Sequence, residues 1–162
     1  IKYIKYVNLQ KFHSNKKPSQ EKIKELYEKN KKFFTEVFKS LKYAEIIPQL
    51  ITGKKEYDKA FFKQLDVIEN KILDGQSFNE AVKENNLKTI TIDKTNKNKQ
   101  DKDKIKIEDI PENLFKKIFT IKDEKSPEIV NLDNKYFLVE VNSVEKINKS
   151  INDSEVLKAL ND

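Results

Sequence analysis

Apolar residues recur at helical spacing between Tyr57 and Leu73, which is the strongest periodic pattern in the chain. The pattern places four large side chains at i, i+4, i+7 and i+11, namely Phe61, Leu65, Ile68 and Ile72. Asp74-Gly75 follows, and glycine is favoured just after the last helical residue. We therefore predict a long helix over residues 57–73.

Capping residues predict three more helices. Ser77 with Glu80 three residues later forms a capping-box sequence, and Ser19 can cap a helix up to Phe34. Asp153 or Ser154 can cap a last short helix. We also expect Thr35-Glu36 to start a further turn through Val37, Phe38 and Leu41.

The strand predictions follow the remaining apolar segments. Alternation is typical of half-buried strands and predicts them over residues 1–9, 42–47, 87–92, 105–107 and 136–141. A short strand over 128–130 follows the Ser126-Pro127 turn, and Ile110-Pro111 starts a helix that reaches Phe119. Residues 93–104 contain only polar and charged side chains, and they predict an exposed loop.

Composition excludes several classes of site. The 162 residues are 36% hydrophobic, 37% charged and 10% aromatic, which is polar but not typical of disorder. The only glycines, Gly53 and Gly75, exclude a glycine-rich phosphate loop. The absence of cysteine excludes disulfides and thiolate catalysis, and no apolar run approaches the roughly 18 residues of a membrane helix. No cofactor or metal is expected.

The net charge of +6 comes from lysine alone. All 33 basic residues are Lys, and arginine supplies most specific guanine contacts and bidentate phosphate contacts. Lysine also alternates with Glu and Asp, as on a solvated surface. Nucleic acid is therefore not an expected partner. The chain begins at Ile1 and contains no Met, so we expect a processed fragment whose targeting signal or anchor lies upstream.

Three segments resemble parts of parvulin-type peptidyl-prolyl isomerases, the rotamase family. They are the helix junction 72–82, the helix 110–119 and the closing hairpin 126–141. Their order over residues 42–147 is also similar to that family. The resemblance implies an α+β fold of the FKBP-like superfold, in which helices wrap a small antiparallel sheet.

The upstream part resembles the segment before the isomerase domain in periplasmic foldases of the PpiD- and SurA-like class. Tyr27, Asn30, Lys31 and Phe33 match a helix of that segment. The implied organisation is a strand-helix segment of a chaperone module at 1–41, a parvulin-like domain at 42–147 and a C-terminal extension at 148–162. The implied location is the periplasm, with any inner-membrane anchor upstream of this chain.

The family lines its pocket with apolar side chains and a pair of histidines on adjacent central strands. Here the two positions fall at Glu45 and Phe137, and the only histidine, His13, lies outside the parvulin-like region, where a surface-loop role is expected. No catalytic residue is therefore assigned. Glu45 either faces solvent or lines a groove. The resemblance implies substrate-binding candidates, with core packing as the alternative for the four on the helix: Leu114, Phe115, Ile118, Phe119 and Phe137.

Three functions remain open. The first is a weakly catalytic or non-catalytic folding factor that binds unfolded or extended polypeptide clients. The second is an active peptidyl-prolyl cis-trans isomerase in which an apolar pocket replaces the histidines. The third is a structural or partner-docking domain of an envelope assembly. In that case the pairs Phe33-Phe34 and Phe61-Phe62 would contribute to an interface.

Overall fold

The structure, a computed structural model, describes residues 18–161 and falls into two compact units. One unit contains the described residues up to Thr35 together with those from Asn148 onward. The other is formed by Glu36–Ile147. The strand predicted over residues 1–9 lies outside the described residues.

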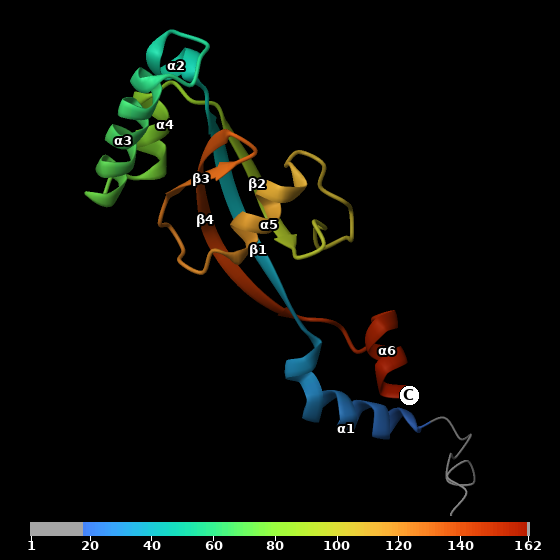
Figure 1. Ribbon diagram of the computed structural model, residues 1–162. Coiled ribbons are helices and arrows are strands. Elements are labelled where there is room, and N and C mark those ends of the chain that lie inside the picture. Colours follow the sequence, from blue (N-terminus) through green and yellow to red (C-terminus); the bar gives the residue numbers. More distant parts are fainter. Residues whose placement is uncertain (1–17, 162) are drawn as a thin grey trace, which may run out of the picture. The chain divides into compact units, whose positions relative to one another are not determined.

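The larger unit is built on a four-stranded antiparallel sheet (Figure 1). Its strands are β1 (Thr35–Ile46), β2 (Thr89–Asn96), β3 (Glu128–Leu132) and β4 (Lys135–Asn148), in the order β2-β1-β4-β3. β1 and β4 are therefore the central strands. Together with the helices around the sheet, this confirms the predicted α+β class with a small antiparallel sheet.

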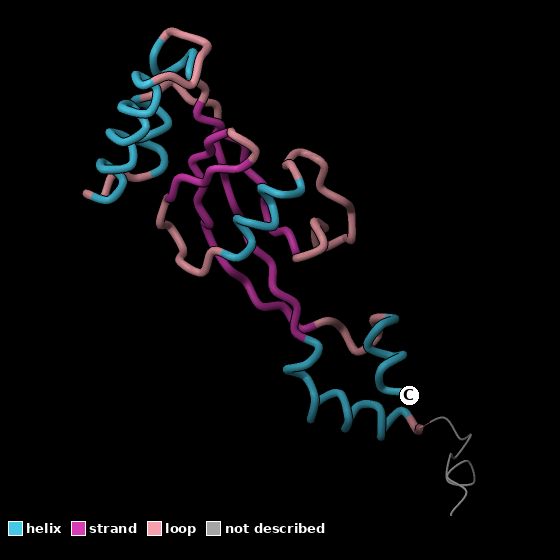
Figure 2. Tube along the Cα trace, in the orientation of Figure 1, coloured by secondary structure: helices cyan, strands magenta, loops and turns pink. Residues whose placement is uncertain are grey.

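Four helices accompany the sheet (Figure 2), and three of them were predicted. They are α2 (Pro48–Thr52), α3 (Lys59–Leu73), α4 (Phe78–Glu84) and α5 (Glu112–Thr120). The Ser77 side chain accepts a hydrogen bond from the Glu80 backbone N–H, and the Glu80 carboxylate accepts one from the Ser77 backbone N–H. The predicted capping box is thus confirmed. Helix α2 was not predicted.

The two faces of the sheet carry separate cores, because successive strand residues point to opposite sides. Leu41 and Tyr43 of β1 pack with α5. Ala44 and Ile46 of the same strand pack with α3 and α4. One face is therefore covered by a single short helix, and the other by a helix pair.

The smaller unit joins α1 (Gln20–Asn30), the 3-10 turn η2 (Lys31–Phe34) and α6 (Ser154–Asn161). Its core residues are Tyr27, Val156 and Leu160. The Tyr27 hydroxyl also donates to the backbone carbonyl of Lys149 at 2.8 Å. The predicted C-terminal extension is therefore one unit with the segment around α1. Within residues 18–161, no helix is long and apolar enough to cross a membrane.

Two local predictions are wrong, and the strand predicted over residues 105–107 is reduced to an isolated bridge between Lys106 and Gln100. Residues 37–41 are not a helical turn, because β1 begins at Thr35, ahead of the predicted start of the domain at Lys42. The charged run is not an exposed loop throughout, since β2 extends to Asn96 and buries Thr95 completely.

Candidate functional site

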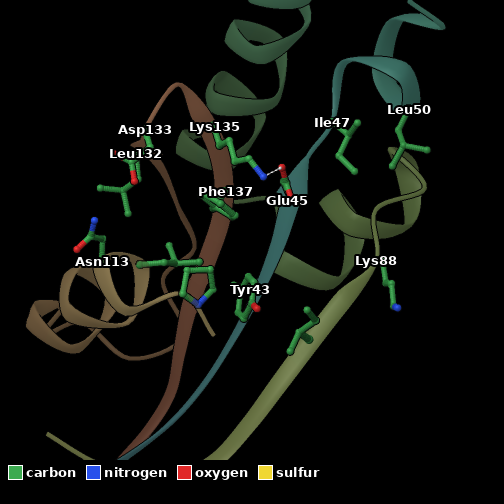
Figure 3. Close-up of a pocket in the computed structure, with 13 residues that line it drawn as sticks. Tyr43, Glu45, Ile47, Leu50, Lys88, Asn113, Leu132, Asp133, Lys135 and Phe137 are labelled. Carbon is green, nitrogen blue, oxygen red and sulfur yellow. Dashed lines mark ion pairs between the residues drawn. The ribbon is translucent and has the colours of Figure 1, made fainter. Parts of the chain in front are cut away.

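An open cavity of about 410 Å³ lies at one end of the sheet (Figure 3), and we call it the groove. This volume falls in the range of ligand-binding pockets. The residues that line it come from β1, α2, the start of β2, the start of α5 and the β3–β4 hairpin: Tyr43, Glu45, Ile47, Leu50, Lys88, Ile90, Pro111, Asn113, Leu114, Leu132, Asp133, Lys135 and Phe137.

The floor of the groove is apolar and firmly packed. Tyr43 and Phe137 are 5% and 6% exposed, and Leu114 of α5 is 1% exposed. The two rings lie on the neighbouring strands β1 and β4 and meet edge to face, with centroids 6.3 Å apart. That arrangement is one of the favourable geometries for aromatic pairs. The floor therefore offers a preformed surface to an apolar group.

The Tyr43 hydroxyl is held within the protein. It donates to the backbone carbonyl of Asp109 at 2.6 Å. Burial raises the pKa of Tyr43 above its usual value, and the carboxylates of Asp109 and Glu45 add to the shift, because a phenolate would be poorly solvated and repelled there. At neutral pH the phenol is therefore protonated, and its O–H donates to the Asp109 carbonyl.

A charged pair stands over this floor. Lys135 Nζ lies 3.1 Å from Glu45 Oε1, as the dashed line in Figure 3 marks. The Glu45 side chain is 33% exposed and that of Lys135 is 56% exposed. A pair this open to solvent contributes at most about 1 kcal/mol, so it can be exchanged for another partner at small cost.

Two of the five predicted substrate-binding residues, Leu114 and Phe137, line the groove. Phe115 and Ile118 lie in the core beneath α5, at 2% and 0% exposure. Phe119 packs against that core from the end of the helix, with its ring 5.4 Å from Phe115. The helix thus reaches the groove only through its first turn and the proline before it.

The far end of α5 is fixed by a buried lysine. Lys39 of β1 is 7% exposed, and its ammonium donates to the carbonyls of Phe119 and Ile121 at 2.6 and 2.5 Å. The same group lies 5.0 Å from the centre of the Phe119 ring. Burial lowers the pKa of Lys39. A cation at a helix C-terminus is electrostatically favourable, so this contact helps to hold α5 over the sheet.

The two positions that the family resemblance assigns to histidines meet in this groove. Glu45 and Phe137 lie on the central strands β1 and β4, and both line the cavity. Glu45 therefore lines the groove, which was one of its two expected placements. His13 lies outside the described residues. Within residues 18–161, no three His, Asp or Glu side chains are grouped so that they could hold a metal ion.

The sequence prediction missed the hairpin side of the groove and Tyr43. Leu132 and Lys135 flank the Asp133-Asn134 turn, in which both residues have positive φ values of 51° and 61°. An Asp-Asn pair between two apolar runs is a recognisable hairpin signal. Tyr43 could have been found from Glu45, because residues two apart on a strand share a face.

A second charged pair lies on the other face of the sheet. Lys42 Nζ is 2.9 Å from Glu140 Oε1, and the two side chains are only 15% and 8% exposed. The ammonium also lies 4.6 Å from the centre of the Phe78 ring and donates to Asn79. The pair is largely buried, and its lysine also contacts Phe78 and Asn79, which is typical of a structural role.

No protein-family model, no curated protein and no solved structure matches this chain.

Proposed function

We propose that the groove binds short segments of unfolded or extended polypeptide, and that the protein acts as a folding factor with weak or no isomerase activity. The apolar floor of Tyr43, Leu114 and Phe137 carries this proposal. Beside this buried floor the groove opens to solvent, where Ile47 and Leu50 are 40% and 42% exposed. Unfolded chains expose the apolar side chains that such a groove can cover. The sequence resemblance to parvulin-type foldases agrees with this role and with a periplasmic location.

Binding is favoured over catalysis because the polar groups near the apolar floor are already engaged. Prolyl isomerisation requires a rotating amide to be stabilised against a barrier of about 18–20 kcal/mol. The two positions that would carry histidines hold Glu45, which is ion-paired, and the apolar Phe137. The nearest hydroxyl, on Tyr43, already donates to a backbone carbonyl. The groove therefore offers contact area and few groups free to act on an amide.

A docking role has one observation in its favour. Of the aromatic pairs expected at an interface, Phe33 is 73% exposed and Phe62 is 42% exposed. Phe61 is fully buried, and Phe34 stacks on Tyr27 at 5.8 Å in the smaller unit. The exposed rings lie outside the groove, so variants in the two places separate the two functions.

The test is a refolding assay with a client whose slow phase is limited by proline isomerisation. We expect suppressed aggregation and an unchanged slow phase. Leu50→Glu places a charge at the edge of the groove and should abolish the suppression. Val67→Glu is the matched control, because both residues are helical, at 42% and 40% exposure, and Val67 lies outside the groove. Acceleration of the slow phase would favour an active isomerase. If Leu50→Glu and Val67→Glu reduced the suppression of aggregation equally, the claim that clients bind in the groove would be contradicted.

A further inference from the structure

We propose that the groove selects client segments in which a basic residue, arginine above all, stands between two apolar residues, and that Glu45 is the residue that reads the positive charge. This inference rests on the proposed function and concerns its specificity.

The groove has apolar surface on both sides of Glu45. Figure 3 shows Leu132 on one side of the Glu45–Lys135 pair, and Ile47 and Leu50 on the other. Ile47 and Leu50 are 40% and 42% exposed, so this second apolar surface is open to solvent. An extended segment that covers both surfaces must pass over the charged pair. The residue that it places there contacts Glu45 or Lys135.

The two members of the pair are not equally replaceable. Glu45 belongs to the central strand β1, and two-thirds of its side chain is shielded. Lys135 is the first residue of β4, next to the hairpin turn, and more than half of its side chain is exposed. Lysine carries its charge on a flexible, well-hydrated stem. An incoming cation can therefore displace the Lys135 ammonium into solvent, while the carboxylate stays in place.

Arginine is the partner that gains most from this exchange. Its planar guanidinium binds a carboxylate through two parallel hydrogen bonds, whereas an ammonium interacts as a point charge. An anion placed beside Lys135 would meet an ammonium that is largely in water, where the attraction is weak and screened. The other groove carboxylate, Asp133, adds to the preference for a cation. The remaining cation, Lys88, extends away from Glu45 in Figure 3.

The experiment measures the affinity of three fluorescein-labelled peptides for the whole chain by anisotropy at about 0.15 M salt. The peptides share two leucines and differ only in the residue between them, which is Arg, Gln or Glu. At this salt the long-range effect of the net charge is screened beyond about 8 Å. We expect the Arg peptide to bind about fivefold tighter than the Gln peptide, the upper limit for a partly exposed pair, and the Glu peptide to bind more weakly.

Variants assign the preference to one residue. Glu45→Gln should remove most of the difference between the Arg and Glu peptides and leave only the contribution of Asp133. Lys135→Gln should tighten binding of the Arg peptide, because the competing ammonium is gone. Glu84→Gln is the matched control, since this carboxylate is also exposed and paired with a lysine, Lys71, but lies outside the groove. It should leave the preference intact.

The outcomes separate this inference from the function on which it rests. Binding of the Gln peptide with no preference among the three would overturn the charge selection alone. Tighter binding of the Glu peptide, lost in Lys135→Gln, would overturn it in favour of an acid-selecting groove. Failure of all three peptides to bind would overturn the proposed function as well.

Discussion

At the scale of single residues, the environment of Tyr43 gives the groove its most direct spectroscopic signal. Its phenol is buried, and it donates to the carbonyl of Asp109. The protonated form is therefore favoured in the folded state, and the pKa is raised. Since the same phenol titrates near pH 10 when unfolded, the stabilisation is complete below about pH 10 and is lost as pH rises through the folded pKa.

Tyr43→Phe tests this environment. The variant should lack the component of the phenolate absorbance that titrates above the usual tyrosine range, and it should lose about 1 kcal/mol of unfolding free energy with the hydrogen bond. Spectrophotometric titration of both proteins, together with urea unfolding at pH 7, measures the two effects. If the absorbance component that the variant lacks titrates at or below about pH 10, the Tyr43 phenol is not buried and hydrogen-bonded as described.

The pair Lys42–Glu140 is predicted to be structural. Lys42→Met leaves the Glu140 carboxylate buried without its main partner, at a cost of about 3–5 kcal/mol. Glu140→Leu in the same chain should restore most of that loss, because an apolar pair avoids the desolvation of two charges. Lys22→Met, in the exposed pair with Glu25, is the control and should change stability by at most about 1 kcal/mol. Denaturant unfolding of the wild type, the two single variants and the double variant measures these changes. Equal losses of unfolding free energy in Lys42→Met and Lys22→Met would contradict the structural role of the buried pair.

At the scale of elements, local signals predict the helices because the caps are local. The Ser77–Glu80 box needs no information beyond four residues. Ser77→Ala removes the side chain that accepts from the Glu80 N–H and should cost about 1 kcal/mol. Ser150→Ala offers a control, because its hydroxyl accepts a bond from Asn152 in a turn outside any helix. Thermal or urea unfolding would show the difference, and an unchanged stability in Ser77→Ala would mean that packing alone holds α4.

The wrong predictions concern elements whose partners lie far along the chain. Val37, Phe38 and Leu41 fit a helical spacing, but Phe38 is opposite Asn96 in the sheet, and that pairing is invisible in either segment alone. The same holds for the charged run. Lys99 is 6% exposed because its ammonium donates to the carbonyl of Ile110, a contact that composition cannot reveal.

Only part of the groove lining was predicted, because its other contacts also join residues that lie far apart in the sequence. Leu114 and Phe137 were substrate-binding candidates implied by the family resemblance, and both line the cavity. The depth at which Phe115 and Ile118 lie depends on the rotation of α5 about its axis. That rotation is set by contacts such as the one from Lys39 to the end of the helix, and a helical period does not encode it.

At the scale of the whole molecule, the groove belongs to a unit that has its own cores. All residues that line the groove lie within Glu36–Ile147, and both faces of that unit's sheet are covered by its own helices. We therefore expect a fragment of residues 35–148, which keeps β1 and β4 whole, to fold cooperatively and to bind the Arg peptide as the full chain does. Circular dichroism with denaturant and peptide anisotropy measure both properties. A fragment that folds but does not bind would assign part of the site to the smaller unit.

The most direct test of the central claim is to map a bound unfolded polypeptide on the ¹⁵N-labelled whole chain by NMR. The account predicts that a reduced, carboxymethylated client shifts backbone resonances around Tyr43, Glu45, Ile90, Leu132 and Phe137, and that Leu50→Glu abolishes these shifts. Shifts confined to the exposed face of α3 around Phe62 and Val67, or no shifts at client concentrations that suppress aggregation, would contradict it.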